Sequence, residues 1–206
     1  RYEQIEELLV QMLGIREQWI GLLTDEGGLP AEARGIMESS LDDIVHRHLH
    51  TLRQSLDEQD LEEIGSLAHH AASRLAASDN YDVGALHAYL EVPSPPGTDA
   101  QDLAAWHAVA QLLLTAKDTL RSTRGITKAV GFAPGDAEKV RMLALLERMA
   151  EAPAFVDALR VVRTLPATRF TDAQWEILDA ILEVLRRCVE ELRTLFAVRG
   201  TVDHGE

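Results

Sequence analysis

The sequence predicts an all-α protein, a helical bundle of about seven to nine helices. Apolar residues recur at intervals of three and four along almost all of the 206 residues, which is the pattern of amphipathic helices. No segment alternates apolar and polar residues over the length of a strand, because residues 160–163 are too few and lie in a helical context. These two observations exclude a sheet-based fold.

Eight helical segments follow one another along the chain. Their apolar stripes cover residues 5–23, 36–52, 61–75, 86–90, 103–114, 140–146, 155–162 and 175–196. The chain shows no repeat of fixed length, so a solenoid is not expected.

Glycine, proline and capping residues mark where helices end and begin. The first helix should stop at Gly27-Gly28, and Pro30 suits the first turn of the second. Asp60 is expected at the N-cap of the third helix. Thr98 to Gln101 and Thr171 to Gln174 each have the spacing of a capping box, a hydroxyl at the N-cap and a glutamine three residues later.

Later breaks are equally clear. Asp136 can cap the helix that follows residues 131–135, Pro153 and Pro166 bracket a short helix, and Gly200 ends the last one. We expect a single helical domain over residues 1–206, with the Pro-rich loop at 91–98 as the best candidate for an internal seam. The chain has the look of a fragment of a longer protein.

Charge and cysteine content limit the function classes. The formal net charge is −14, which argues against a protein that binds nucleic acids or anionic membranes over its whole surface. One cysteine, Cys188, excludes a disulfide scaffold, and its position beside an apolar stripe predicts a thiol at the edge of the core. The longest stretch without a charged residue, 103–116, is too short to span a bilayer. We expect a soluble, cytoplasmic protein without membrane contact.

Catalytic and metal motifs are missing from the sequence. No glycine is followed by lysine, so there is no phosphate-binding P-loop. Asp57 to Asp60 resembles an acidic magnesium motif but follows an amphipathic helix, so a helix-terminal turn is the better interpretation. His46 and His50 share a helix face, and a third ligand would have to come from elsewhere, Asp42 or Asp43 being close in sequence, so we predict no metal site. The three tryptophans lie at apolar helical positions and are expected in the core.

One segment has the opposite charge to the rest. Residues 115–128 carry Lys117, Arg121, Arg124 and Lys128 against one acid, net +3, while the remainder carries −17. Hydroxyl side chains, Thr115 among them, add groups that suit contacts with phosphate. The alternative is a solvated basic helix that pairs with acidic neighbours.

Several segments in a fixed order resemble one protein family. They are residues 1–9, 16–20, 112–115, 117, 120–121, 131–132, 163–166, 170–175, 191–196 and 199–203. Together they are similar to UvrD-like superfamily 1 DNA helicases of the RecB/AddA type, over nearly the whole chain. His204 departs from the family, which usually has Phe after Val-Asp, so the junction at 203–206 is a point of difference.

The resemblance implies a helical 1B subdomain, an insertion in the helicase motor that helps to hold DNA. The parent would couple ATP hydrolysis to DNA unwinding in recombination or repair, using ATP and magnesium bound outside this segment. This segment itself would hold no cofactor and be inactive alone, with DNA and the rest of the motor as partners. The first and last helices should lie near each other, because both return to one motor domain.

On this reading Lys117, Arg121, Arg124, Lys128 and Thr115 become candidates for contact with DNA phosphates. The alternative function is a helical protein–protein interaction module that docks a partner through acidic faces. An autonomous metal-dependent or hydrolytic enzyme is the weakest of the three hypotheses.

Overall fold

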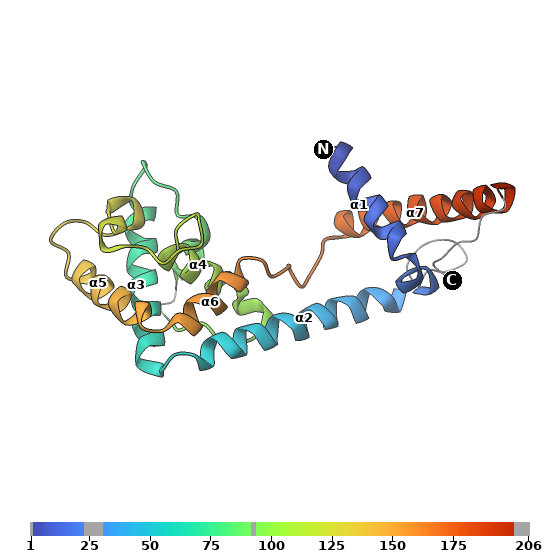
Figure 1. Cartoon of the computed structure of the whole chain (residues 1–206). Coiled ribbons are helices and arrows are strands. Elements are labelled where there is room, and N and C mark those ends of the chain that lie inside the picture. Colours follow the sequence, from blue (N-terminus) through green and yellow to red (C-terminus); the bar gives the residue numbers. More distant parts are fainter. Residues whose placement is uncertain (1, 23–30, 92–93, 200–206) are drawn as a thin grey trace. The chain divides into compact units, whose positions relative to one another are not determined.

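A computed structural model describes residues 2–22, 31–91 and 94–199 (Figure 1). Within these ranges every regular element is a helix, so the all-α prediction is confirmed. The α-helices are α1 (Tyr2–Gly14), α2 (Ala31–Gln54), α3 (Glu58–Ala76), α4 (Leu103–Leu113), α5 (Ala137–Ala150), α6 (Pro153–Val162) and α7 (Asp172–Arg199). Short 3-10 helices η1 to η6 cover residues 16–18, 20–22, 84–89, 100–102, 123–125 and 128–130.

The chain divides into two compact units. Unit 1 comprises residues 1–39 and 169–206, and unit 2 comprises residues 40–168. One boundary falls inside α2 and the other lies between α6 and α7. Neither falls in the loop at 91–98 that the sequence offered as a seam.

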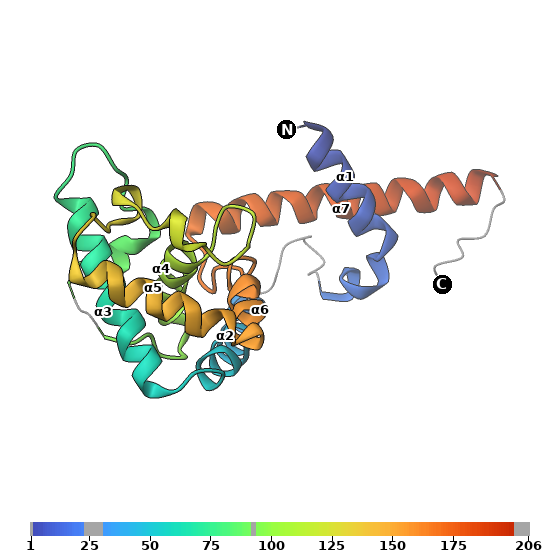
Figure 2. The same ribbon diagram turned by 60° about the vertical axis from the view of Figure 1, so that its left-hand side comes forward.

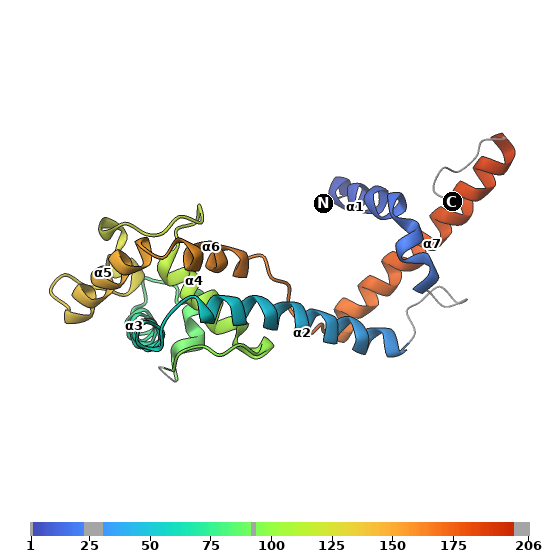
Figure 3. The same cartoon turned by 60° about the horizontal axis from the view of Figure 1, so that its bottom comes forward.

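Unit 1 is built on the pairing of α1 with α7, which cross in every view (Figure 3). Its small core contains Trp19, Leu182, Leu185 and Val189, and the Trp19 indole N–H donates to the Met12 carbonyl at 2.8 Å. The prediction that the first and last helices lie near each other is confirmed.

The ends of these two helices agree only partly with the sequence. The first helix was expected to continue to Leu23, but α1 ends at Gly14 and 3-10 turns follow, because Gly14 favours a break. The expected stop at Gly27-Gly28 and the end at Gly200 lie outside the described residues. At the start of α7 the capping box is confirmed: the Thr171 N–H donates to the Gln174 side chain at 2.8 Å, and the Gln174 N–H donates to the Thr171 hydroxyl at 3.3 Å.

Beside α1, the surface of α7 carries an apolar groove of about 400 Å³. Cys188 is half-buried in its wall, together with Leu13, Val184 and Leu195. The cysteine is thus at the edge of the packed residues, as predicted.

Unit 2 is organised around α4, which contacts α3, α6 and η3 (Figure 1). Nearly every face of α4 is buried, and this explains why its sequence is almost uniformly apolar. The helix α5 packs against α3 and α6 (Figure 2). The three tryptophans, Trp19, Trp106 and Trp175, are all buried, as predicted.

Two caps in unit 2 differ from the prediction. The N-cap of α3 is Asp57, whose carboxylate accepts the Asp60 N–H at 2.8 Å, and Asp60 instead pairs with Arg148 at 2.8 Å. The capping box expected at Thr98 to Gln101 lies one residue later. The Asp99 N–H donates to the Asp102 carboxylate at 2.9 Å. Carboxylates occupy both positions, and they accept backbone N–H groups more strongly than neutral side chains do.

No helix in the described part of the chain is both long and apolar enough to cross a membrane.

Candidate functional site

The basic segment at 115–128 does not form the continuous helix considered above. After α4 the chain turns, with an isolated antiparallel bridge between Leu114 and Leu120, and then forms η5 (Thr123–Gly125) and η6 (Lys128–Val130). The Thr115 hydroxyl bonds the Thr119 hydroxyl at 2.8 Å and accepts the Lys117 N–H at 3.2 Å. Serine and threonine hydroxyls that bond the nearby backbone in this way favour turns over helix.

Arg121 is committed to the end of α4. Its Nε and Nη2 donate to the carbonyls of Leu112 and Gln111 at 3.1 and 3.0 Å, and its backbone N–H donates to the Leu113 carbonyl at 2.8 Å. Burial and the nearby positive charge of Arg163 lower the pKa of its guanidinium. Arg121 therefore has a structural role in this fold, and we leave it out of the candidate contact set.

Two arginines at the C-terminal end of α6 hold the turn in place. Asp118 has a φ of +56°, and its carboxylate pairs with Arg163 at 2.6 Å while its carbonyl accepts from Arg160 at 2.6 Å. Lys117 and Arg124 remain exposed, Lys117 next to Asp118 in the turn and Arg124 in η5. The cations of the segment thus differ in their surroundings, since Arg121 bonds the end of α4 while Lys117 and Arg124 are exposed.

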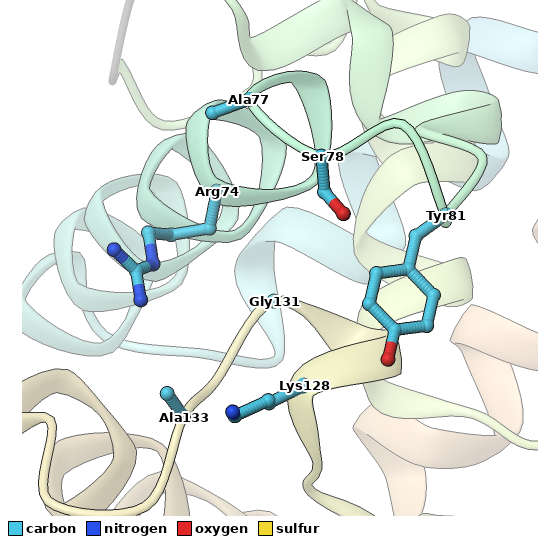
Figure 4. A pocket seen from close by; sticks show the side chains of 7 residues that line it. All are labelled: Arg74, Ala77, Ser78, Tyr81, Lys128, Gly131 and Ala133. Carbon is cyan, nitrogen blue, oxygen red and sulfur yellow. The ribbon is translucent and has the colours of Figure 1, made fainter.

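Lys128 lies in a different environment, a cavity of about 310 Å³ beside the C-terminal end of α3 (Figure 4). Arg74 and Ser78 come from the last turn of α3 and the residues after it, and Tyr81 from the following loop. In Figure 4 the Lys128 side chain extends toward Ala133, away from the Tyr81 ring. The cavity therefore combines two cations, a hydroxyl and an aromatic ring.

A second cavity of about 270 Å³ adjoins the first. Tyr81 and Lys128 line both, and the second adds Thr127 and Lys139. We call the two cavities together the Lys128 site. Two of the three lysines in the chain, Lys128 and Lys139, line it.

Close packing of backbone on backbone holds Lys128 beside α3. Gly131 has a φ of +92°, and a Cβ there would lie 2.6 Å from the Ala71 Cα. Next to it, Phe132 is fully buried, with its ring centroid 5.5 Å from that of His70 on α3. A glycine is needed at 131 both for its conformation and for the close approach.

Tyr81 is held by the loop that follows it. Gln111 of α4 accepts the Ala85 N–H at 2.6 Å and donates to the Val83 carbonyl at 3.1 Å. The Asp82 carboxylate accepts the Gly84 N–H at 3.0 Å, which closes a local turn. Tyr81 itself is 41 % exposed, so its ring is accessible while the residues that follow it are held in place.

The acid closest to these cations is already engaged. Asp136, at the N-cap of α5 as predicted, accepts the Ala133 N–H at 2.8 Å and lies 3.9 Å from both Arg74 and the His70 Nε2. Three cationic side chains, Arg74, Lys128 and Lys139, thus line the Lys128 site, and Arg74 is the one that pairs with Asp136.

Of these residues, only Lys128 was predicted from the sequence. Arg74, Tyr81 and Lys139 come together with it through tertiary packing. One signal was readable: Tyr81 follows the polar break 78–80 rather than an apolar stripe, which is unusual for a ring that belongs to a core.

The histidine pair on α2 has local partners. The rings of His46 and His50 lie 6.0 Å apart, and the His46 Nδ1 contacts the Thr98 carbonyl at 2.9 Å. Among the described residues there is no group of three metal-ligating side chains.

Comparisons with protein-family models, with curated proteins and with solved structures give no match for this chain.

Proposed function

We propose that this chain is an accessory helical module that contacts DNA phosphates, within an ATP-dependent DNA helicase of the recombination or repair type. The resemblance to UvrD-like helicases supplies the helicase setting. The observation that carries the DNA contact is the Lys128 site, where Lys128, Lys139 and Arg74 line two adjoining cavities on an acidic chain.

Lysine and arginine side chains at this density suit phosphate oxygens, which position a nucleic acid without reading its sequence. An overall charge of −14 leaves attraction only where cations are concentrated. The module therefore adds a local contact, while the motor supplies most of the affinity, together with ATP and magnesium.

The test is a salt titration of DNA binding, followed by the fluorescence anisotropy of a labelled duplex between about 50 and 200 mM salt. Three phosphate contacts give a slope of log K against log salt of about −3. The Lys128→Ala/Lys139→Ala variant should bind more weakly and reduce the steepness of that slope by about 2.

Arg193→Ala is the control, because it removes a positive charge from an exposed side chain of α7 that lies outside the basic segment 115–128 and outside the lining of the Lys128 site. It should leave the affinity nearly unchanged. An equal loss in the control would place the contact elsewhere, and a wild-type chain that binds no duplex at low salt would overturn the proposal.

A further inference from the structure

We propose that Tyr81 is a stacking platform for one base of a single-stranded nucleic acid, with the adjoining phosphates held by Lys128, Lys139 and Arg74. This inference rests on the proposed function and deepens it, because it names the form of nucleic acid that the Lys128 site prefers.

The arrangement of ring and charges is the first argument. Tyr81 and Lys128 each line both cavities, so a base on the ring lies in a cavity that also contains a lysine side chain. Arg74 lines one cavity and Lys139 lines the other. A strand that occupies both cavities therefore has cationic side chains available for its phosphates in each of them.

The ring's exposure is the second argument. Tyrosine rings often pack in the interior, as that of Tyr89 in the same unit does at 1 % exposure. Tyr81 is 41 % exposed, although Gln111 and Asp82 fix the residues that follow it. An accessible aromatic ring close to cationic side chains is the combination that single-strand-binding proteins use.

A duplex cannot use this ring in the same way, because each of its bases is already stacked between neighbours. A single strand offers free base faces, and stacking on an aromatic side chain does not depend on which base it is. The Lys128 site should therefore favour single strands while still attracting a duplex through phosphate.

The experiment compares labelled oligo(dT), oligo(U) and a duplex of equal charge by fluorescence anisotropy, with the chain as described. Tyr81→Ala should weaken binding of both single strands about ten-fold and leave duplex binding unchanged. Tyr81→Phe keeps the ring and should bind as the wild type does. Val140→Ala, an exposed apolar position next to Lys139, is the control for general surface changes.

Failure of this inference can be told from failure of the proposed function. If Tyr81→Ala leaves single-strand binding intact while Lys128→Ala/Lys139→Ala weakens every ligand, phosphate contact stands and stacking is overturned. Equal losses for single strand and duplex in Tyr81→Ala would also overturn it. No binding of any ligand by the wild type would overturn both.

A second readout does not depend on affinity. Oligo(dT) that carries 5-iodouracil forms a photo-crosslink to an aromatic side chain on which the base lies. Mass spectrometry should find the crosslink on the peptide with Tyr81, and it should disappear in Tyr81→Ala. A crosslink elsewhere, with none at Tyr81, would contradict the stacking geometry.

Discussion

Arg121 and Arg163 meet at the C-terminal end of α4 and divide its last carbonyl groups between them. Arg163 donates to the Ala110 carbonyl at 3.1 Å, and the Arg121 side chain donates to those of Gln111 and Leu112. The last four carbonyls of an α-helix have no partner inside the helix, and the helix dipole is negative there. Two cations that repel each other are held together because each is bonded to this negative end.

We expect Arg121→Ala to destabilise unit 2. The change removes two side-chain hydrogen bonds to carbonyls near the centre of the core, so the free energy of unfolding should fall by about 2 kcal/mol. Urea unfolding followed by circular dichroism measures it. Arg124→Ala, which removes an exposed arginine three residues later, should stay within about 0.5 kcal/mol of the wild type. Equal effects of the two changes would contradict the capping role.

Gly131→Ala tests the packing that places Lys128. The positive φ costs about 1–2 kcal/mol for a residue with a Cβ, and the clash with the Ala71 backbone adds about 1–3 kcal/mol. Gly135→Ala is the matched control, since its φ is +91° and a Cβ there meets nothing within 4 Å. The unfolding free energy should fall by about 3 kcal/mol for Gly131→Ala and by about 1 kcal/mol for Gly135→Ala. Similar losses in both would show that α3 yields to the added methyl group.

The helices were predictable because each buries a stripe of apolar residues whose spacing is visible in the sequence. The second helix, for example, was expected from Pro30 to Leu52 and is found at Ala31–Gln54. The caps were less predictable because neighbouring residues compete for them. The N-cap of α3 is Asp57, which lies before Asp60 in the sequence. The N-cap of η4 is Asp99, which follows Thr98 directly.

The site was predictable only in its charge. Lysine content singled out Lys128, but the same reasoning also selected Arg121, whose side chain is used by carbonyls of α4. Whether a cationic side chain of this segment faces solvent or bonds the end of α4 depends on how the turn folds back on α4. The spacing of residues in the sequence does not predict this. Arg74 and Tyr81 join Lys128 through the close approach of Gly131 to α3, again a tertiary effect.

Acid should weaken α7 in a defined pH range. Hydrogen bonds from Arg186 and Arg187 lower the pKa of Glu183 from 4.5 to about 2. A depressed pKa in the fold gives stability that is present above pH 4.5 and is lost as the pH falls to about 2. Glu183→Gln should therefore unfold more easily than the wild type at neutral pH and equally easily below pH 2. An NMR titration of the Glu183 carboxyl carbon with a midpoint near 4.5 would contradict the pairing.

Tyr89→Phe should stabilise unit 2. The Tyr89 hydroxyl is buried and has no hydrogen-bond partner among the residues that the structure describes, and its burial, together with the nearby Asp102 carboxylate, raises the pKa of the phenol. An unsatisfied buried hydroxyl costs about 1–3 kcal/mol, so its removal should increase the unfolding free energy by about 1 kcal/mol.

The raised pKa adds a dependence on pH that separates this effect from better packing. Because the folded state resists ionisation of Tyr89, the wild type should lose stability as the pH rises above 10, while the phenylalanine variant lacks that part of the loss. The gap between the two unfolding midpoints should thus widen between neutral pH and pH 11 (about one unit above the ordinary tyrosine pKa). Tyr81→Phe, with its exposed hydroxyl, should show neither the gain nor the widening. A loss of stability in Tyr89→Phe at neutral pH would mean that the hydroxyl is bonded in solution.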